Sequence, residues 1–526
     1  MTRDRFVEDR LPPPDQLPEF RLLDYPARLN AATELLAGGN PGDLAVVNMR
    51  GRWTFADLDN FSGRIARLLV DEHGLIPGNR VLLRGPNGYT LFAAWLGVLK
   101  AGGVAVATMP LLRPGEIATV IDRAEVSHAI VDARFIGDFR DAMEQTRHIR
   151  HLLKYDGDFG QGELESRTAK LNPLPAIDTA QDDPALIAFT SGTTGIPKGC
   201  VHFHRDLLSP CDTFAKTHFA LKPGDIALTS APIAFTFGLG ATLLFPLRSG
   251  AAAATLEQAS PAQLLEAIAT YGVTHLATAP TAYKAMLSDP ALGAALKSLR
   301  TCLSAGEHLP ETVWRAWHDR TGITIVDGIG ATEMMHIFIS ASGDAIRPGS
   351  TGKAVSGYEA AVLDPQGNPL PEGEGRLAIK GPTGCRYLDD PRQADYVQQG
   401  WNVTGDTYAR DKDGYFWYRA RSDDMIVSSG YNIAAPEVEN ALLAHPAVAE
   451  CAVIGVPCEE RGQKLKAFVV LAPEKEPSAT LTAELKDFVK AAIAPYKYPR
   501  DVEFVPALPK TATGKLRRNE LRASSQ

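Results

Sequence analysis

Short apolar runs alternate with longer helix-like stretches from Leu44 onward. Arg80–Leu83 and Val104–Ala107 have the length and composition of buried strands, whereas Phe55–Glu72 and Thr90–Ala101 carry apolar residues at helical spacing. The alternation returns in later apolar runs, namely Ala185–Phe189, Ile226–Ser230, His275–Thr278 and Ile323–Val326. Since strands that alternate with helices pack as a sheet covered by helices, we expect a layered α/β fold.

The sequence changes character after Gly349, where glycine and proline become frequent. Turn signals at Asp364–Gly375 and Asp411–Tyr415 indicate closely spaced strands. The last part of the chain has helix-like and strand-like segments of its own, namely Pro436–Ala444, Val448–Val456, Lys466–Leu471 and Leu481–Ile493. We therefore expect a large multi-layered N-terminal domain of mixed sheets and helices with a small β-rich subdomain, followed by a small α+β C-terminal domain.

Composition excludes several classes of protein. A net charge of -8 is poorly suited to nucleic acids, because their phosphates require a basic surface. The six cysteines form no C-x-x-C pair, which indicates reduced thiols rather than a disulfide scaffold or a zinc site. The first residues lack the apolar core of a signal peptide, and every apolar run is far shorter than a membrane span. We expect a cytoplasmic enzyme that binds neither nucleic acid nor a membrane.

The run Ala185–Phe189 leads directly into the string TSGTTGIPKG at residues 190–199. Its glycines let the backbone approach an anion, its hydroxyls offer donors, and Lys198 offers a charge. A strand that ends in such a loop is typical of phosphate sites. The loop is not a Walker A motif, because Gly199 follows Lys198 where that motif has Ser or Thr. By composition alone, a flexible surface loop is an equal interpretation.

Four further strings follow in order along the chain: DGIGATE at Asp327–Glu333, WNVTGD at Trp401–Asp406, RARSDDMIVSSGYNIAAPEVE at Arg419–Glu439, and PKTATGK at Pro509–Lys515. Each one alone reads most simply as a solvated loop. Together with residues 190–199 they resemble, in content and order, the signature motifs of the adenylate-forming superfamily, also called the acyl-CoA synthetase or AMP-binding superfamily. That superfamily joins acyl-CoA synthetases, peptide-synthetase adenylation domains and firefly luciferase.

The resemblance implies a reaction that uses ATP, Mg²⁺ and coenzyme A. The ATP-binding residues that it implies are Thr190, Ser191, Gly192, Thr193, Thr194, Glu307, Asp327, Gly328, Ile329, Asp406 and Arg421. The catalytic residues that it implies are Lys198, Thr332, Glu333 and Lys515, with Glu333 as the Mg²⁺ ligand. Mg²⁺ favours one carboxylate together with phosphate oxygens, and a lysine stabilises the charge that develops as the acid attacks the α-phosphate.

The resemblance also divides the chain. It implies an N-terminal AMP-binding domain at residues 1–422 and a mobile C-terminal domain at residues 423–526 that carries Lys515. Asp423 would be the hinge about which the C-terminal domain turns after adenylation. Residues Ser429, Gly430 and Tyr431 would then line the site for the coenzyme A thiol.

Three strings bear on the acid: AFTFGLG at Ala234–Gly240, SAGE at Ser304–Glu307 and GATEMMHIF at Gly330–Phe338. They resemble the benzoate-CoA ligase branch. The substrate-binding residues that this implies are Phe235, Thr236, Phe237, Gly238, Ala305, Gly306, Gly330, His336 and Ile337. Aromatic and aliphatic walls would leave a short, flat cavity, with His336 and Ile337 touching the ring.

Within that branch, the sequence resembles most the 2-aminobenzoate-CoA ligase group. The shared strings are LPPPDQLPEF at Leu11–Phe20, RVLLRGPN at Arg80–Asn87 and VATMPLLR at Val106–Arg113. Ala234 and Thr236 would give extra room and a hydroxyl for an ortho substituent. We therefore prefer 2-aminobenzoate, with benzoate, salicylate or another substituted benzoate as alternatives. Thr236 could equally be core packing, and His336 a structural histidine.

Other functions are open at this stage. The nearest is a stand-alone aryl adenylation enzyme that loads a carrier-protein pantetheine. A luciferase-like oxygenase and a non-enzymatic sensor of adenylates or acyl groups are more distant alternatives. The expected partners are a small aromatic acid, ATP and coenzyme A, with a homodimer as the oligomeric state. Dependence of AMP release on free coenzyme A distinguishes these functions.

Overall fold

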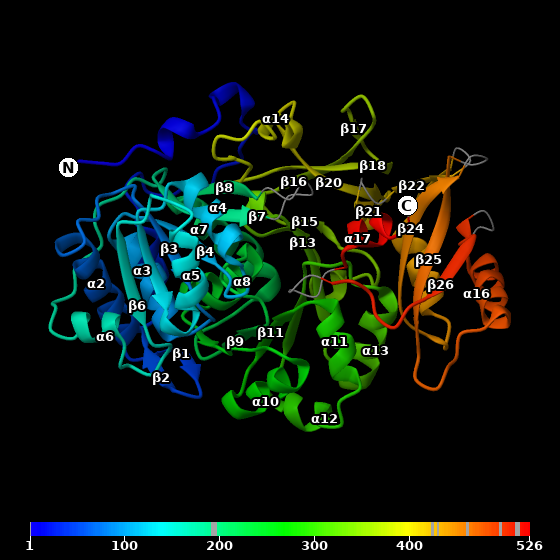
Figure 1. Ribbon diagram of the computed structural model, residues 1–526, viewed down its shortest axis with the longest axis horizontal. Helices are drawn as coiled ribbons and strands as arrows, with labels where there is room; N and C mark the ends of the chain where they lie inside the picture. Colours follow the sequence, from blue (N-terminus) through cyan, green and yellow to red (C-terminus); the bar gives the residue numbers. More distant parts are fainter. Residues whose placement is uncertain are drawn as a thin grey trace. The chain divides into compact units, whose positions relative to one another are not determined.

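The computed structural model describes residues 2–190, 197–421, 425–428, 431–458, 462–493, 497–510 and 516–525 (Figure 1). The chain divides into two compact units. The first takes in Met1–Leu309, Val313–Ala360 and Ile379–Asn402, and the second Pro310–Thr312, Ala361–Ala378 and Val403–Gln526. The expected domain boundary at residues 422 and 423, with Asp423 as the hinge, lies outside the described residues and stays a prediction.

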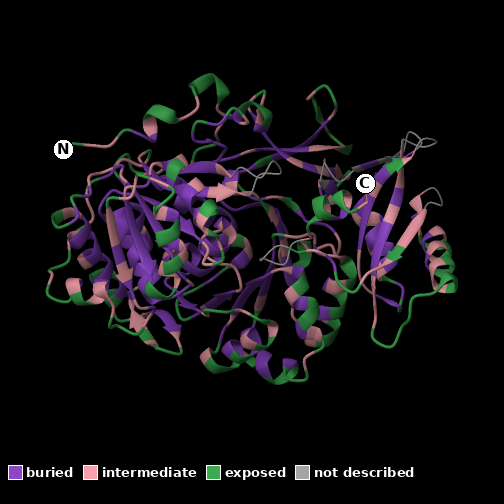
Figure 2. Ribbon diagram, viewed as in Figure 1, coloured by how far each residue is buried: buried purple, intermediate pink, exposed green. Residues whose placement is uncertain are grey.

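One sheet of the first unit has the strand order β6-β5-β3-β4-β7-β8. Its strands are β3 (Arg80–Arg84), β4 (Val104–Thr108), β5 (His128–Asp132), β6 (His151–Tyr155), β7 (Pro184–Thr190) and β8 (Lys198–Phe203). All neighbours are parallel except β7 and β8, which are antiparallel. Every residue of β3, β4 and β5 is buried (Figure 2), so both faces of the sheet are covered.

Helices α2 (Phe55–Asp71), α3 (Tyr89–Lys100), α4 (Pro114–Ala124) and α5 (Ile136–Met143) accompany this sheet. Side chains of α4 and α5, such as Ile121 and Phe139, share a core with Leu82 of β3 and Val106 of β4. Thr54 begins α2 with a capping box, since its hydroxyl accepts from the backbone N–H of Asp57 and the Asp57 carboxylate accepts in return. Local capping and an apolar face together explain why these helices form here.

A second sheet of the first unit has the order β15-β14-β13-β12-β11-β9-β10-β1-β2. Its strands are β1 (Leu44–Asn48), β2 (Gly51–Thr54), β9 (Ile226–Thr229), β10 (Ala252–Ala254), β11 (His275–Thr278), β12 (Thr301–Ser304), β13 (Ile325–Gly330), β14 (Ile337–Ser340) and β15 (Lys353–Ala354). In this order the neighbours from β13 to β1 are parallel. The pairs β15-β14 and β14-β13 at one edge and β1-β2 at the other are antiparallel.

Helices α10 (Pro261–Tyr271), α11 (Pro280–Leu287) and α13 (Glu311–Thr321) supply large side chains to the core of the second sheet. Tyr283 and Trp317 meet there edge to face, with ring centroids 4.8 Å apart. Several shorter helical segments complete the first unit, namely α7 (His204–Pro210), the π-helical segments Cys211–Phe219 and Gly240–Leu244, α8 (Thr236–Leu239) and α9 (Phe245–Arg248).

The glycine-rich region forms a sheet of the order β17-β16-β18-β20-β19, with β21 paired to β20. Its strands are β16 (Glu359–Leu363), β17 (Pro369–Leu370), β18 (Gly373–Lys380), β19 (Val397–Gln398), β20 (Trp401–Arg410) and β21 (Phe416–Arg421). The turn predicted at Asp411–Tyr415 joins β20 to β21, and the Asp411 N–H donates to the Tyr415 carbonyl at 3.0 Å. The β-rich subdomain predicted from the turn signals is confirmed.

The C-terminal part has a sheet of the order β23-β22-β25-β24, with β26 paired to β25. The strands are β22 (Met425–Ser428), β23 (Tyr431–Ala434), β24 (Val448–Cys458), β25 (Gly462–Leu471) and β26 (Asp501–Phe504), and the helices are α15 (Ala435–Leu443), α16 (Ala479–Ala492) and α17 (Arg518–Ala523). Val438 and Leu442 of α15 share a core with Leu485 and Val489 of α16. The expected fold class is confirmed, whereas the mobility of this part stays a prediction.

In the part of the chain that the structure describes, no helix combines the length and the apolar character needed to span a membrane.

Candidate active site

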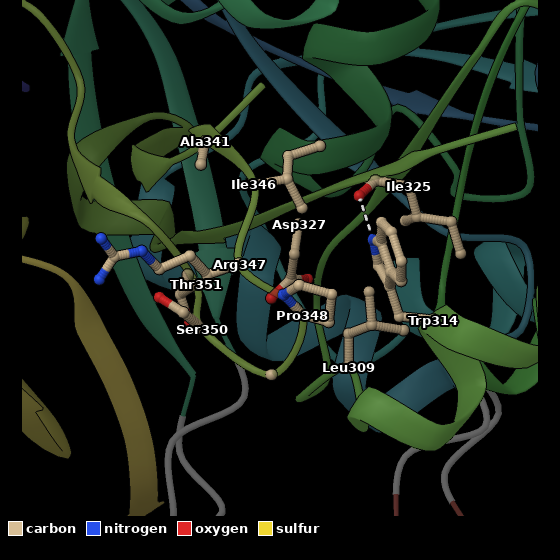
Figure 3. Close-up of a pocket in the computed structure, with 11 residues that line it drawn as sticks. Leu309, Trp314, Ile325, Asp327, Ala341, Ile346, Arg347, Pro348, Ser350 and Thr351 are labelled. Carbon is tan, nitrogen blue, oxygen red and sulfur yellow. Dashed lines mark hydrogen bonds between the residues drawn. The ribbon is translucent and has the colours of Figure 1, made fainter. Parts of the chain in front are cut away.

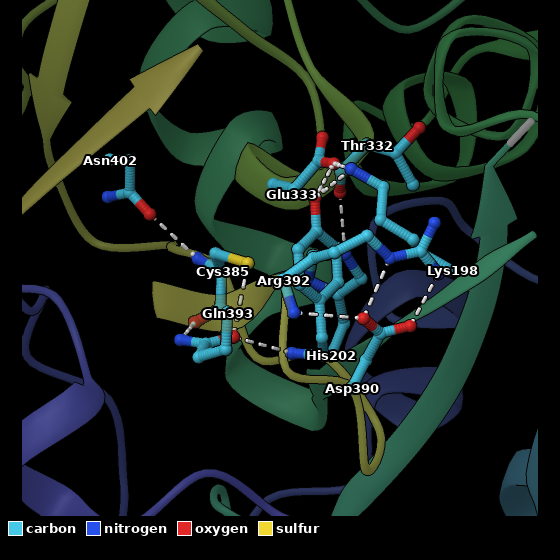
Figure 4. Close-up of polar contacts among 10 residues, drawn as sticks. Lys198, His202, Thr332, Glu333, Cys385, Asp390, Arg392, Gln393 and Asn402 are labelled. Atoms are coloured by element: carbon cyan, nitrogen blue, oxygen red, sulfur yellow. Dashed lines mark hydrogen bonds and ion pairs between the residues drawn. The ribbon is translucent and has the colours of Figure 1, made fainter. Parts of the chain in front are cut away.

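Lys198, Glu333 and Tyr387 form a tight polar cluster (Figure 4). Lys198 is the first residue of β8, and Glu333 lies in the short 3₁₀ turn Thr332–Met334 between β13 and β14. The Tyr387 hydroxyl donates to Oε1 of Glu333 and lies 2.5 Å from Nζ of Lys198. Nζ itself is 3.5 Å from the same carboxylate oxygen. Tertiary contacts therefore join two residues that the sequence predicted separately, Lys198 and Glu333.

The turn that carries Thr332 and Glu333 is fixed by a side-chain contact at its start and by an unusual backbone angle at its end. His202 of β8 places Nε2 2.8 Å from the Thr332 carbonyl oxygen, and burial lowers the pKa of His202, so that its neutral tautomer donates here. Met335 ends the turn with a backbone φ of 67°, a conformation that residues other than glycine rarely adopt. Strain of this kind is commonly retained where a functional residue must be aimed.

Glu333 is the candidate Mg²⁺ ligand. Both of its contacts within the described residues fall on Oε1, which leaves Oε2 for a cation. Among the described residues, no group of three or more His, Cys, Asp or Glu side chains is arranged to hold a metal ion. One carboxylate with a free oxygen fits Mg²⁺, because this ion takes few protein ligands and completes its shell with phosphate oxygens and water.

Asp327 stands at the carboxyl end of the parallel strands, opposite Ser304 of β12. It lines a small pocket, with room for about one water molecule, together with Leu309, Trp314, Ile325 and residues 346–351 (Figure 3). Oδ1 of Asp327 is buried and has no hydrogen-bond partner among the described residues, and burial raises the pKa of this carboxyl to about 8. An unsatisfied carboxyl at this edge of an α/β sheet is suited to a polar ligand.

His336, one of the predicted acid-binding residues, is surrounded by aromatic rings, of which Phe237 was also predicted. Its ring centroid lies 4.5 Å from that of Phe245, 5.7 Å from that of Phe214 and 5.8 Å from that of Phe237. The side chain is buried, and burial lowers the pKa of His336 to about 3. A neutral imidazole among three phenyl rings gives an apolar, aromatic surface.

Close approach of the backbone explains two glycines near this ring. A Cβ atom on Gly330 would lie 2.7 Å from the His336 carbonyl oxygen, and one on Gly240 would lie 2.4 Å from the His336 ring. Ile337 packs against Gly328 in the same way, since a Cβ there would approach its side chain to 2.8 Å. Gly330, His336 and Ile337, predicted as one set, are therefore brought together.

The other predicted wall residues surround α8. Phe235 precedes that helix, and Thr236, Phe237 and Gly238 lie within it. Ala234 and Thr236 line a tight crevice with residues of β4, β7 and α8, too narrow in this structure to admit a water molecule. Ala305 is buried and Gly306 is exposed with φ of 87°, and Glu307 is half-buried. These last three follow β12 and lie outside the aromatic cluster around His336.

Two predicted nucleotide-binding residues of the second unit lie on adjacent strands, and of Arg421 the structure describes the backbone alone. Asp406 of β20 and Arg421 of β21 are register partners in an antiparallel pair, and the Asp406 side chain is buried. Gly328 and Ile329 follow Asp327 in β13, and Thr190 ends β7. Of Tyr431 the structure describes the backbone alone, at the start of β23. Predicted residues that fall outside the described ranges are Ser191, Gly192, Thr193, Thr194, Asp423, Ser429, Gly430 and Lys515.

Sequence reasoning missed Phe214, Phe245 and Tyr387. Phe245 follows Phe237 by eight residues on a continuous helical run, a spacing of about two turns that could have suggested a shared face. Phe214 belongs to a separate π-helical segment, and Tyr387 to a loop after β18. No local pattern marks these two residues, because only tertiary packing brings them to the site.

Comparison with known proteins adds to this geometry. The model of the AMP-binding enzyme family matches residues 34–386, and that of the AMP-binding enzyme C-terminal domain matches residues 437–515. The chain is 36% identical over 513 residues to the benzoate–CoA ligase of Thauera aromatica, covering 95% of this chain and 97% of that protein.

Solved structures of two aryl-CoA ligases are also similar to this chain along almost its whole length. The anthranilate CoA ligase AuaEII, in complex with anthranoyl-AMP, is similar with a TM-score of 0.90 and 34% identity, covering 96% of this chain and 98% of that one. A benzoate CoA ligase from Burkholderia xenovorans LB400 is similar with a TM-score of 0.87 and 34% identity, covering 94% of this chain and all of that one.

Proposed function

The chain belongs to the AMP-binding enzyme family, and from that premise we propose that it joins 2-aminobenzoate to coenzyme A. It is an acid–thiol ligase of the aryl-CoA type that uses ATP, Mg²⁺ and coenzyme A. The acid's carboxylate attacks the α-phosphate of ATP, pyrophosphate leaves, and the thiol then displaces AMP. We further propose that the ring of this acid carries an ortho amino group, and we assign roles to individual residues of the chain.

The turn from Thr332 to Ile337 carries the proposal. Glu333 stands at one end of the turn and the aromatic cluster of His336 at the other, three residues away. An aromatic acid that packs on His336 and Ile337 would have its carboxylate beside Thr332 and Glu333. Holding the two reacting groups side by side is the main way in which a protein accelerates such a reaction.

The chain's own residues have separate roles in this proposal. Lys198 and Lys515 neutralise charge on the phosphates and on the attacking carboxylate. The Thr332 hydroxyl contacts the α-phosphate, and Glu333 holds Mg²⁺, which when bound supplies charge neutralisation at the phosphates. Burial of the aromatic wall excludes water, so that the activated acid is kept for the thiol.

The remaining contacts of the nucleotide fall to two groups of residues. Asp327, with Glu307, Gly328 and Ile329, receives the base, and Asp406 with Arg421 receives the ribose. Thr190 through Thr194 enclose the phosphates, while Ser429, Gly430 and Tyr431 meet coenzyme A once the C-terminal domain turns about Asp423. The unpartnered Oδ1 of Asp327 supports the first of these roles, since an exocyclic amine would supply the missing donor.

The preference for 2-aminobenzoate is supported by the wall at Ala234 and Thr236. Both residues line the same narrow crevice beside α8, and Thr236 is buried. A methyl side chain leaves room for an ortho substituent, and a threonine hydroxyl can accept a hydrogen bond from its amine. A site that pairs a buried polar group with the substrate discriminates against the analogue that lacks it.

The decisive experiment measures AMP and acyl-CoA formation with ATP, MgCl₂ and each of 2-aminobenzoate, salicylate and benzoate, with and without coenzyme A. We expect kcat/KM for 2-aminobenzoate to exceed that for benzoate by about 10-fold or more. Thr236→Val keeps the shape of the wall and should lower kcat/KM for 2-aminobenzoate alone. A higher kcat/KM for benzoate would refute the ring preference, and strict dependence on a carrier protein would refute the thiol.

Two further parts of the proposal concern the whole protein. We expect a homodimer in solution, which size-exclusion chromatography with light scattering would establish, and a cytoplasmic location, in keeping with the sequence composition. A monomer at micromolar concentration would contradict the first of these.

A further inference from the structure

We propose that Tyr387 is a positioning residue that links Lys198 to Glu333 and holds their ion pair at a longer distance than it would otherwise reach. The inference rests on the proposed roles of Lys198 and Glu333 and adds a residue that no motif of the sequence indicated. Its basis is the geometry of the cluster, in which one hydroxyl stands between a cation and an anion.

The distances show which contacts are made through the hydroxyl. A direct bond between an ammonium and a carboxylate spans about 2.7–2.9 Å. Nζ of Lys198 is 3.5 Å from Oε1 of Glu333, beyond that range, but only 2.5 Å from the Tyr387 hydroxyl. The hydroxyl accepts from Lys198 and donates to Glu333. It therefore bonds to both charged groups while their direct ion pair stays at 3.5 Å.

The arrangement leaves each charged group a free side for the substrate. Within the described residues, Oε2 of Glu333 makes no contact, so it can face a divalent cation. The Lys198 side chain is 19% exposed, whereas that of Glu333 is 9% exposed, so the ammonium is the more open to a phosphate. Without the hydroxyl, Lys198 would be drawn to Oε1, and both groups would be less available to ATP with Mg²⁺.

Tyr387 is itself held firmly. The loop that carries it pairs with β8, where Leu388 N–H donates to the Gly199 carbonyl at 2.9 Å. The side-chain oxygen of Gln393 accepts from the Tyr387 backbone N–H at 2.9 Å. The Tyr387 ring is 1% exposed and meets the Tyr396 ring edge to face, with centroids 5.9 Å apart. A hydroxyl carried by so fixed a ring can set the positions of its neighbours.

Tyr396 offers a matched control. It belongs to the same buried cluster, and its ring lies 5.8 Å from Nζ of Lys198. Its hydroxyl is not among the groups that contact Glu333 within the described residues. Tyr396→Phe therefore removes one hydroxyl from the same surroundings without touching the bridge, whereas Tyr387→Phe removes the bridge and keeps the ring.

The test is binding of ATP with MgCl₂, in the absence of any acid, by isothermal titration calorimetry. We expect Tyr387→Phe to weaken binding about 10- to 100-fold, as loss of a residue that orients a metal ligand does. Glu333→Gln should weaken it similarly, and Tyr396→Phe by less than about twofold. KM for the aromatic acid should change little in Tyr387→Phe, since the aromatic cluster is separate.

The double variant Tyr387→Phe/Glu333→Gln distinguishes positioning from a structural role. Because Tyr387 acts through Glu333 and Lys198, the double variant should lose less affinity than the sum of the two single losses, whereas independent effects would add. Additive losses, unchanged binding in Tyr387→Phe, or failure of that variant to fold would each overturn the inference. Unchanged binding in Glu333→Gln would instead refute the proposed metal site itself.

Discussion

At the scale of single residues, the site retains groups that folding alone would disfavour. Oδ1 of Asp327 is buried and makes no hydrogen bond of ordinary geometry among the described residues. Ser304 and the backbone N–H of Gly328 lie near this carboxyl and lower its pKa in part, against the larger effect of burial. A buried polar atom without a partner costs about 1–3 kcal/mol. Such a cost is commonly retained where a ligand supplies the missing partner, and it accompanies a raised pKa at Asp327.

Asp327→Asn should stabilise the ligand-free protein at pH 8 and weaken ATP binding. The pKa of Asp327 is raised from 3.8 to about 8, so the unfolded chain loses this proton at a lower pH than the folded chain does. Folding stability from this group is therefore complete below about pH 4 and falls as the pH rises to about 8. Asparagine does not ionise, so the variant lacks this decline.

Chemical denaturation at pH 5 and pH 8 measures this effect. The difference in unfolding free energy between the variant and the parent should be larger at pH 8 than at pH 5. Calorimetry at pH 8 should show ATP binding weakened by about 3- to 10-fold, because asparagine keeps an acceptor oxygen for the base but lacks the carboxylate charge that strengthens the hydrogen bond. A stability difference that is the same at both pH values would contradict the assignment.

At the scale of secondary-structure elements, short distorted helices shape the acid pocket. α8 passes into the π-helical segment Gly240–Leu244 and then into α9, a run that carries both Phe237 and Phe245. π-helical turns often occur at functional sites, because the inserted residue changes the direction of the side chains that follow. Here both phenylalanines contact His336, which comes from the turn before β14.

Gly240→Ala tests this packing. The added Cβ would lie 2.4 Å from the His336 ring, so the ring must move into the aromatic cluster. Overpacking of this kind costs about 1–3 kcal/mol, and we expect KM for the aromatic acid to rise about 10-fold. Gly272→Ala is the control away from the site, since a Cβ there meets nothing within 4 Å although its backbone is strained. A KM for the acid equal to that of the parent would show that this helix does not shape the pocket.

At the scale of the whole molecule, the residues for which we propose roles come from both compact units. Lys198, Glu333 and the aromatic cluster belong to the first unit, whereas Asp406 and Arg421 belong to the second, as does Lys515 in the sequence. We propose that Lys515 serves adenylation and not thiol transfer, as in enzymes that complete each step by moving a domain.

Lys515→Ala should separate those two steps. Removing the charge that stabilises the attacking carboxylate should slow adenylate formation at least about 100-fold. Transfer of a supplied acyl-adenylate to coenzyme A should proceed within about threefold of the parent rate, since that step uses no attacking carboxylate. Single-turnover assays of each half-reaction measure both rates. Equal loss in the two would contradict a role confined to adenylation.

The sequence by itself determined the layered α/β class, the small C-terminal α+β part and the order of the motifs. These features are local: the period of apolar residues selects strand or helix, and a string such as Asp327–Glu333 needs no distant partner to be read. For the same reason Gly330, His336 and Ile337 could be predicted together, because one turn holds all three.

Tertiary structure alone decided the surroundings of those motifs. Tyr387 reaches Lys198 and Glu333 only because its loop pairs with β8, and Phe214 and Phe245 meet His336 only because separate helical segments pack against one turn. Contacts between residues far apart in the chain leave no periodic pattern, since their energy comes from packing and hydrogen bonds made after folding. The sequence therefore identified the class of reaction, and the fold revealed the neighbours, such as Tyr387 and Phe245, that surround the proposed site residues.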